Sequence, residues 1–390
     1  MTNYQFLKPY TFANGATVKN RVVIPPMTEQ SSLEDGSVSR DELYYAGLRA
    51  GGVGMFISPV ANVTANGKGF EGQLSAADDK FIPSLAKLAT AMKGTGHGSK
   101  AILQIFHAGR MSMSTILRGT QPESASAVAA PREGMETPRE LTDAEVQDIV
   151  TAFGEATRRA ILAGFDGVEI HGANTYLIQQ FFSPHSNRRT DKWGGSVEKR
   201  MTFGLEIIKA AKAAIDQYAT SPFILGYRIS PEEIEEPGIR IPDTLQFIDK
   251  LADEPLDYLH ISMGNAWRKS LNDKSETEPT ILRIKKTVNN RVPLISVGAI
   301  QTPADAEKVM DAGIDFVAIG REYLREPHWI QKVEAGLEDT IRYRVNRTEL
   351  DDLGLNPALM EFLGLLGTDL GFEGEADTGV VSPYDVVLNK

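Results

Sequence analysis

The sequence contains no cysteine among its 390 residues. This absence excludes disulfides, iron–sulfur clusters, thiolate zinc sites and a catalytic thiol together. The chain also lacks any apolar run close to the roughly 20 residues that a membrane span needs. Its first ten residues, "MTNYQFLKPY", show no apolar run behind a basic start, so no secretory signal is expected. We therefore expect a cytoplasmic protein with no membrane partner.

Basic residues are fewer than acidic residues in this chain. The chain has 41 Lys and Arg residues against 52 Asp and Glu residues, for a formal net charge of −11. A nucleic-acid-binding protein normally presents a basic face, so we expect no nucleic-acid partner. The chain is otherwise ordinary for a globular protein, at 42% hydrophobic and 24% charged residues. A chain of this length buries a large core without covalent cross-links.

Short apolar, β-branched runs recur along the chain, and their apolar residues are nearly continuous rather than alternating. Strands that are buried on both faces of a parallel sheet have this pattern. The eight runs cover residues 21–25, 53–58, 101–106, 166–171, 223–229, 256–262, 292–298 and 315–320.

Amphipathic segments with helix signals separate these runs. Residues 141–164 begin with Thr142 and Glu145, which form a capping-box pattern, and end at Gly164. Residues 302–313 begin with a threonine cap and a proline and end at a glycine. Strands that alternate with helices predict an α/β protein. The count of eight favours an eightfold β/α (TIM) barrel, although a doubly wound open sheet would give a similar alternation.

The predicted barrel forms a single domain over residues 1–335. Long loops follow the third, fourth and sixth strands, at 107–140, 171–197 and 263–277. They lie on the strand-to-helix side, where barrel enzymes build their active sites. Residues 336–390 form a C-terminal extension that is rich in acidic residues and glycine and contains an apolar patch. We expect this extension to pack on the barrel or to form an interface.

Polar side chains gather at the expected carboxyl ends of the strands, among them Gln104, His107, His171, Asn174 and Arg228. The set holds no carboxylate pair of the glycosidase kind. It has no clear carboxylate–histidine metal cluster, so no metal is expected. Lysine is absent from these strand ends, which argues against a Schiff-base aldolase. Amides, imidazoles and arginines suit a polar, partly anionic heteroaromatic ligand.

Glycines and an arginine end the last two strands. Gly298 follows the seventh strand, and Gly320 and Arg321 follow the eighth. Backbone N–H groups after these strands form a frequent phosphate site of such barrels. Glycine allows close backbone approach, and arginine adds a bidentate positive charge. We interpret the three residues as a phosphate site; the alternative is two tight turns and a surface arginine.

Four segments carry a resemblance to a known family. They are "HGANTYLIQQFFSPHSNRRTDKWGGSVEKR" (171–200), "VKNRVVIPPMT" (18–28), "QIFHAGR" (104–110) and "AIGREYLREP" (318–327). Over about residues 4–335 the chain resembles the old yellow enzyme family of FMN-dependent NADH:flavin oxidoreductases, or ene-reductases. The resemblance implies an eightfold barrel with non-covalent FMN at its rim.

The resemblance also implies cofactor contacts. The backbone around Pro26 and Met27 and the Thr28 hydroxyl would face the flavin, with His171 also against it. Ala61 and Gln104 would contact the pyrimidine edge. Arg228 would lie near N1 and the C2 carbonyl, where negative charge develops on reduction. Gly298, Gly320 and Arg321 would hold the phosphate. One branch of the family has a cysteine at the position of Thr28, so tuning of the flavin here would use a hydroxyl.

His171, Asn174 and Tyr176 resemble the catalytic and substrate-binding residues of the family. The first two would bind the carbonyl or nitro oxygen of an electron-poor alkene and stabilise the charge that develops there. Tyr176 would donate a proton to the α-carbon, although a phenol with a pKa of about 10 is a weak acid. The alternative is a core histidine followed by loop-capping residues. His107 and Arg110 are interpreted as supports of the third loop, and His185 and Trp193 as shaping the fourth.

The leading hypothesis is an enzyme that takes hydride from NADH or NADPH through FMN and passes it to a small activated alkene in ping-pong fashion. A tRNA dihydrouridine synthase-like barrel would need a basic face and usually a cysteine, so the net negative charge and the lack of cysteine argue against it. A non-enzymatic flavin-binding or interaction protein would use residues 336–390. A lyase or aldolase barrel would hold no flavin. The preferred nicotinamide, and whether the chain forms a homo-oligomer, are left open.

Overall fold

The computed structural model describes residues 4–94, 96 and 98–376. Within them, eight parallel strands pair side by side, and the first strand pairs with both the second and the last, so the sheet closes into a barrel. This closure confirms the predicted barrel and rules out an open doubly wound sheet. The strands are β3 (Val22–Ile24), β4 (Met55–Asn62), β6 (Lys100–Phe106), β9 (Gly167–Gly172), β10 (Ile224–Ile229), β11 (Tyr258–Ile261), β12 (Leu294–Val297) and β13 (Phe316–Ala318).

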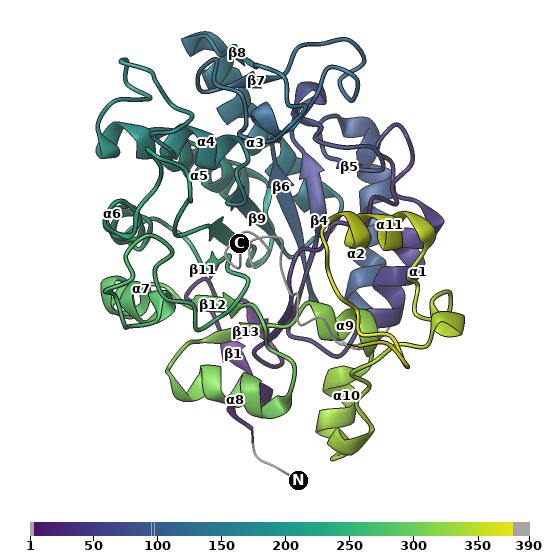
Figure 1. Cartoon of the computed structure of the whole chain (residues 1–390). Helices are drawn as coiled ribbons and strands as arrows, with labels where there is room; N and C mark the ends of the chain where they lie inside the picture. The colour runs from purple at the N-terminus through teal and green to yellow at the C-terminus, as the bar shows by residue number, and fades with distance from the viewer. Residues whose placement is uncertain (1–3, 95, 97, 377–390) are drawn as a thin grey trace.

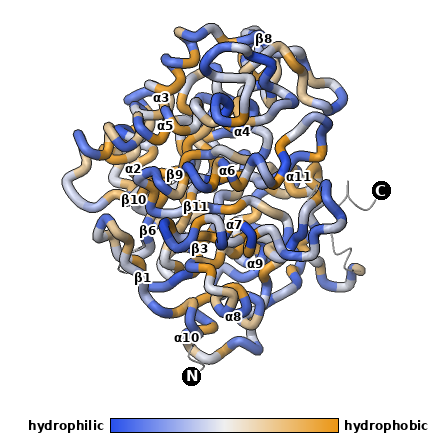
Figure 2. The backbone as a smooth tube through the Cα atoms, turned by 90° about the vertical axis from the view of Figure 1, so that its left-hand side faces the viewer, coloured by the Kyte–Doolittle hydropathy of each residue, from blue (hydrophilic) through white to orange (hydrophobic). Residues whose placement is uncertain are grey.

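A helix follows each barrel strand, and together these helices surround the barrel (Figure 1). They are α1 (Arg40–Arg49), α2 (Ile82–Lys93), α3 (Asp143–Leu162), α5 (Val197–Tyr218), α6 (Ile241–Leu251), α7 (Thr280–Val288), α8 (Pro303–Asp311) and, after the last strand, α9 (Arg321–Arg325) and α10 (Trp329–Glu334). Hydrophobic stretches of the chain gather inside the molecule and hydrophilic ones predominate at its edge (Figure 2). No helix of the described residues combines the length and the apolar character needed to cross a bilayer.

The predicted caps are present at both helices singled out from the sequence. The Thr142 hydroxyl accepts the N–H of Glu145, and the Glu145 carboxylate accepts the N–H of Thr142 in return. Thr302 and Asp305 form the same reciprocal arrangement at the start of α8. Such caps satisfy N–H groups that the first turn of a helix leaves unpaired. Each helix therefore begins within two residues of its predicted start.

An N-terminal hairpin, which the sequence patterns did not indicate, packs against the inner apolar core. It consists of β1 (Tyr10–Thr11) and β2 (Thr17–Val18). Phe12 and Val18 belong to the same buried cluster as Ile102, Ile224 and other strand residues. The Phe12 ring stacks on Phe316 of β13 at a centroid distance of 5.4 Å. The inner core is thus apolar toward this end, which leaves the opposite end for polar groups.

The long loops carry short elements of their own. They include β7 (Glu123–Ser124), β8 (Arg139–Glu140), α4 (Leu177–Phe182) and the 3-10 turn η4 (Gly109–Met111). Other short elements lie outside these three loops: β5 (Leu74–Ser75) and the 3-10 turns η1 (Gln5–Leu7), η2 (Ala65–Gly67), η3 (Asp79–Phe81), η5 (Glu338–Thr340) and η6 (Arg347–Glu349). β7 and β8 pair within the loop that follows β6. α4 lies in the loop that follows β9, so two of the three long loops are locally ordered.

The described part of the C-terminal extension folds back over α1 and α9. Its helix α11 (Pro357–Leu365) covers most of the apolar patch of the sequence and buries Leu359 and Leu363 in the main core cluster. Arg49 of α1 donates to the Leu353 carbonyl at 2.8 Å, and Arg325 of α9 donates to the Leu370 carbonyl at 2.7 Å. Residues 377–390 lie outside the described residues.

Candidate active site

A layer of polar side chains lies across the inside of the barrel, nearer the carboxyl ends of the strands. In-register pairing places Gln104 beside Glu169, His171 beside Arg228, and Arg228 beside His260. In-register neighbours in a sheet share a face, so three of the predicted residues lie together with two that were not predicted. All five side chains are buried, with 0 to 8% of each residue exposed.

Gln104 is held by a carboxylate in this layer. Its Nε2 donates to Glu169 Oε1 at 2.6 Å, and its backbone N–H donates to Ser58 Oγ at 3.0 Å. Ala61 is fully buried near the end of β4 and pairs with Ile105, next to Gln104. The predicted pyrimidine-edge residues therefore come from two adjacent strands.

His171 is a neutral hydrogen-bond donor at the end of β9. Burial lowers its pKa well below the usual range, and the nearby charges of Arg228 and His260 act in the same direction. Nδ1 accepts the backbone N–H of Ala173 at 3.4 Å. A neutral imidazole that accepts at one nitrogen carries its proton on the other, so Nε2 is the donor. This is the tautomer that binding a substrate oxygen requires.

Asn174 is oriented by two serines at the ends of the neighbouring strands. Its Oδ1 accepts from Ser262 Oγ at 2.9 Å and from Ser230 Oγ at 3.3 Å. Its backbone N–H donates to Ser230 Oγ at 3.0 Å, and its φ of 56° lies in the left-handed region that asparagine tolerates. With Oδ1 engaged on the protein, the amide donates through Nδ2.

Tyr176 lies beside His171 in the same short loop. Its ring meets the His171 ring edge to face at a centroid distance of 5.1 Å, and the Phe106 ring at 4.8 Å. Tyr176 is half-buried and forms the N-cap residue of α4. His171 and Tyr176 are thus in contact at the rim, and Asn174 lies between them in the sequence of the same loop.

Arg228 supplies a buried positive charge without a full set of protein partners. It is 8% exposed, and its Nε has no hydrogen-bond partner among the described residues. Burial lowers its pKa, while Glu169 and the Tyr258 phenol oppose that shift. Arginine stays protonated in proteins. An orphaned donor on a buried cation fits a ligand that carries or develops negative charge.

The segment after β3 lies against the segment after β13. A Cβ added to Gly320 would come within 3.3 Å of both Met27 Sδ and Pro25 Cγ. Pro26, Met27 and Thr28 are all half-buried. Gly320 is the N-cap residue of α9. The first and last strands of the closed barrel therefore contribute neighbouring parts of the rim.

Two features of the structure, a positive φ and a close backbone neighbour, require glycine at position 298. Its φ of 118° disfavours any side chain, and an added Cβ would lie 2.5 Å from the Met263 carbonyl oxygen. Arg321, on the first turn of α9, donates to the Asp369 carbonyl of the C-terminal extension at 3.3 Å. β12 and β13 are adjacent, so Gly298 and Gly320 end neighbouring strands, as a phosphate cradle requires.

The donor set fits FMN. Arg228 and Gln104 are a buried cation and a buried amide, the groups that the pyrimidine end of a flavin would need, and Gly298, Gly320 and Arg321 are the glycine turns and cation that a phosphate would need. Among the described residues, no group of three or more His, Asp or Glu side chains is arranged to hold a metal ion.

The remaining predicted residues make loop contacts. His107 Nδ1 accepts the N–H of Gly109 at 3.0 Å, and its Nε2 lies 3.2 Å from Glu123 Oε1. Arg110 donates to the carbonyls of residues 128 and 129 at 3.2 and 3.0 Å. Trp193 Nε1 donates to Asp143 at 2.5 Å. His185 is half-buried, and burial lowers its pKa.

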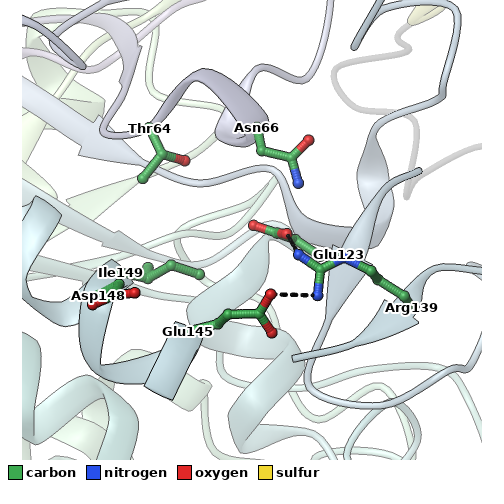
Figure 3. Close-up of a pocket in the computed structure, with 7 residues that line it drawn as sticks. All are labelled: Thr64, Asn66, Glu123, Arg139, Glu145, Asp148 and Ile149. Carbon is green, nitrogen blue, oxygen red and sulfur yellow. Dashed lines mark hydrogen bonds and ion pairs between the residues drawn. The ribbon is translucent and has the colours of Figure 1, made fainter. Parts of the chain in front are cut away.

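A surface cleft beside this loop is separate from the polar layer. It has a volume of about 200 Å³ and is lined by Thr64, Asn66, Glu123, Arg139, Glu145, Asp148 and Ile149. Figure 3 shows the Arg139 guanidinium between two carboxylates, and it lies 2.5 Å from Glu123 and 2.9 Å from Glu145. Arg139 pairs with both Glu123 and Glu145, and no residue of the polar layer lines the cleft.

Sequence reasoning missed Glu169, Tyr258 and His260 inside the barrel and Ser230 and Ser262 at its rim. A signal for Glu169 and His260 was present in the sequence. Glu169 interrupts the apolar run "DGVEIH" with a charge, and His260 interrupts "LDYLHIS" with an imidazole. A strand that is buried on both faces has few reasons to carry such a side chain. No comparable signal marks the serines, since serine is common after strands.

Comparisons with known proteins agree with the barrel fold. A family model described as the NADH:flavin oxidoreductase / NADH oxidase family matches residues 5–340. The solved structure of morphinone reductase superimposes with a TM-score of 0.73 at 25% identity, covering 86% of this chain and 90% of that one.

Three relatives have descriptive names. NADH:acrylate oxidoreductase of Vibrio harveyi is 49% identical over 84% of this chain, and NADH:fumarate oxidoreductase of Klebsiella pneumoniae is 43% identical over 93% of it. The chain spans 33% and 39% of the length of these two proteins. Probable NADH-dependent flavin oxidoreductase YqiG of Bacillus subtilis is 45% identical, over 91% of this chain and 94% of its own.

Proposed function

Since the chain belongs to the NADH:flavin oxidoreductase / NADH oxidase family, an FMN-dependent family of old yellow enzyme type, we propose that it passes hydride from NADH or NADPH to an activated alkene. The observation that carries this proposal is the pair formed by His171 and Asn174. Each side chain is fixed so that a donor N–H remains for a ligand. Two such donors bind one oxygen, and the oxygen that activates an alkene is a carbonyl, nitro or carboxylate oxygen.

The pair acts on charge that develops during the reaction. FMN, when bound, accepts hydride from the nicotinamide and returns it to the alkene. The activating oxygen becomes more negative as the β-carbon is reduced, and the His171 and Asn174 donors stabilise it there without reorganising. Tyr176, beside His171, supplies a proton to the α-carbon. In this proposal the nicotinamide and the alkene both exchange hydride with the same FMN, so they bind in turn and the kinetics are ping-pong.

The names of the relatives support a substrate with a conjugated carbonyl or carboxylate. Acrylate and fumarate are both alkenes activated by a carboxylate, and two relatives are named for them. We propose that this chain reduces alkenes of the same kind, including enones. Gly298, Gly320 and Arg321 hold the FMN phosphate in this proposal, and the segment from Pro26 to Thr28 faces the flavin together with Ala61 and Gln104.

The test uses the purified protein under anaerobic conditions. We expect bound FMN to bleach on addition of NADH or NADPH and to regain its colour on addition of cyclohexenone or acrylate. A protein that neither contains nor binds FMN would overturn the proposal. Bleaching by a nicotinamide without recovery by either alkene would restrict the chain to oxidising the nicotinamide, with the electrons passing to another acceptor.

Replacement of His171 tests the donor pair. We expect His171→Ala to lower kcat/KM for the alkene about 100-fold, the order of magnitude for loss of one oxyanion donor. FMN affinity should change less than the alkene reaction does. His185→Ala is the matched control, because His185 is a half-buried histidine of the same long loop that lies outside the donor pair. Equal losses of FMN and of alkene reduction in His171→Ala would contradict the assigned role.

A further inference from the structure

Glu169 is a carboxylate in an unfavourable place for a charge. It lies in the middle of β9 and is fully buried. A buried charge needs partners, and Glu169 has three donors: Gln104 Nε2 at 2.6 Å, His260 Nδ1 at 2.9 Å and the Tyr258 hydroxyl at 3.0 Å. Burial opposes its ionisation, but the surrounding His260, Arg228 and Gln104 groups lower its pKa, so it carries a negative charge.

The fold makes specific room for this cluster. Tyr258 reaches Glu169 across β10, which lies between their two strands. The β10 residue at that level is Gly226, and a Cβ there would lie 2.1 Å from the Tyr258 ring. Any side chain larger than glycine would therefore displace the phenol from the carboxylate.

The carboxylate lies deeper in the barrel than two of the predicted flavin contacts, His171 and Arg228, and beside a third, Gln104. Glu169 precedes His171 by two residues on the same strand, which sets it about 7 Å deeper on the same face of the sheet. His171 pairs in register with Arg228. The negative charge of Glu169 is thus one layer below the positive charge of Arg228.

Glu169 also fixes the orientation of the Gln104 amide. An ionised carboxylate only accepts hydrogen bonds, so the group that faces it must be the amide nitrogen of Gln104. The Gln104 oxygen is then directed elsewhere, as an acceptor. The pyrimidine ring of a flavin carries one N–H between two carbonyl groups, and an acceptor is what that N–H requires.

We propose that Glu169 is a positioning residue for the cofactor, which orients Gln104 and whose charge lowers the reduction potential of bound FMN. This inference rests on the proposed function, because it requires FMN over the same polar layer. Reduction adds negative charge to the pyrimidine end of the flavin. Arg228 favours that change and Glu169 opposes it, so Glu169 makes the reduced cofactor a stronger hydride donor.

The charge is tested with Glu169→Gln in the FMN-loaded protein, by equilibration with a reference dye without oxygen. We expect the equilibrium constant for two-electron reduction to rise at least tenfold, which is a shift of about 30 mV. Asp257→Asn is the matched control. It makes the same change in a partly buried carboxylate just before β11, at the opposite end of that strand from the rim. The control should change the constant less than twofold.

The positioning is tested with Glu169→Asp, which keeps the charge and withdraws it from Gln104 by one methylene. We expect FMN to bind at least fivefold more weakly, while the reduction equilibrium stays within threefold of the wild type. This variant also tests the positioning role if Glu169→Gln does not fold.

Each outcome has a distinct meaning. A Glu169→Gln protein that holds FMN with an unchanged potential would remove the electrostatic role. Wild-type FMN affinity in Glu169→Asp would remove the positioning role. In both cases the proposed function would stand. Failure of the wild-type protein to bind FMN would overturn the proposed function itself.

Discussion

At the scale of single residues, the hydrogen bonds of Asn174 decide what this side chain offers to a substrate. An amide has a donor end and an acceptor end of almost the same shape. Ser262 and Ser230 both donate to Oδ1, so the donor end is left for the substrate. A substrate oxygen would be repelled by the opposite orientation. The two serines therefore support the donor pair without belonging to it.

Loss of one serine should weaken alkene reduction selectively. We expect Ser262→Ala to lower kcat/KM for the alkene about fivefold, since a typical hydrogen bond contributes about 1 kcal/mol. Ser262→Thr keeps the hydroxyl and should restore most of the rate. The measurement is stopped-flow reoxidation of the reduced protein by the alkene, beside its reduction by NADH. Equal slowing of both half-reactions would mean that Ser262 has a general structural role instead.

At the scale of elements, one glutamine of α4 joins the two loops that flank the site. Gln180 Nε2 donates to the Thr175 carbonyl at 2.7 Å and to the Ala108 carbonyl at 3.0 Å. Its Oε1 accepts from Arg110 N–H and from Ser124 Oγ. Thr175 has a φ of 67°, which is unfavourable for a β-branched residue. Gln180 therefore holds a strained backbone next to Asn174 and Tyr176.

Gln180→Glu should be costly because it changes little but the hydrogen bonds. The new carboxylate cannot donate to the two carbonyls, and each buried bond that is lost costs about 1–3 kcal/mol. We expect the free energy of unfolding in urea to fall by about 2–4 kcal/mol. Gln121→Glu is the control, because Gln121 is an exposed glutamine of the loop after β6. If both variants lose the same stability, the buried network is not the cause.

At the scale of the whole molecule, buried carboxyl groups tie the stability of the fold to pH. Burial raises the pKa of Glu42 in α1 from 4.5 to about 7, although hydrogen bonds from Ser32 and Ser39 act against the shift. Burial likewise raises the pKa of Glu322 to about 7 and that of Asp257 to about 6. Between pH 4.5 and 7 the folded chain therefore binds protons that the unfolded chain has released. Stability falls as pH rises through this window.

Glu42→Gln should remove one part of that pH dependence. A glutamine is neutral at every pH, so the variant no longer loses stability when the carboxyl ionises. Relative to the wild type, we expect its free energy of unfolding to rise by about 2–3 kcal/mol between pH 5 and pH 8. Urea unfolding at several pH values measures this difference. A constant difference over the range would show that Glu42 does not titrate there.

The sequence by itself determined the strands and the helix caps, and the count of eight strands favoured a barrel over an open sheet. Continuous apolar runs fix where buried strands lie, and Thr142 with Glu145 fixes the start of α3, because both depend on residues close together in the chain. The polar strand ends Gln104, His171 and Arg228 were also identified in advance. They could be collected on one rim because parallel strands present their carboxyl ends to the same side.

Only the tertiary structure decided what surrounds those side chains. The carboxylate beside Gln104 is Glu169 of β9, and the other two donors to Glu169 lie on β11. The serines that orient Asn174 follow β10 and β11. The hairpin β1–β2 packs on strands far along the chain. Such contacts depend on strand register and on the closure of the sheet. No local pattern encodes these, since a shift of one residue would turn each side chain to the other face.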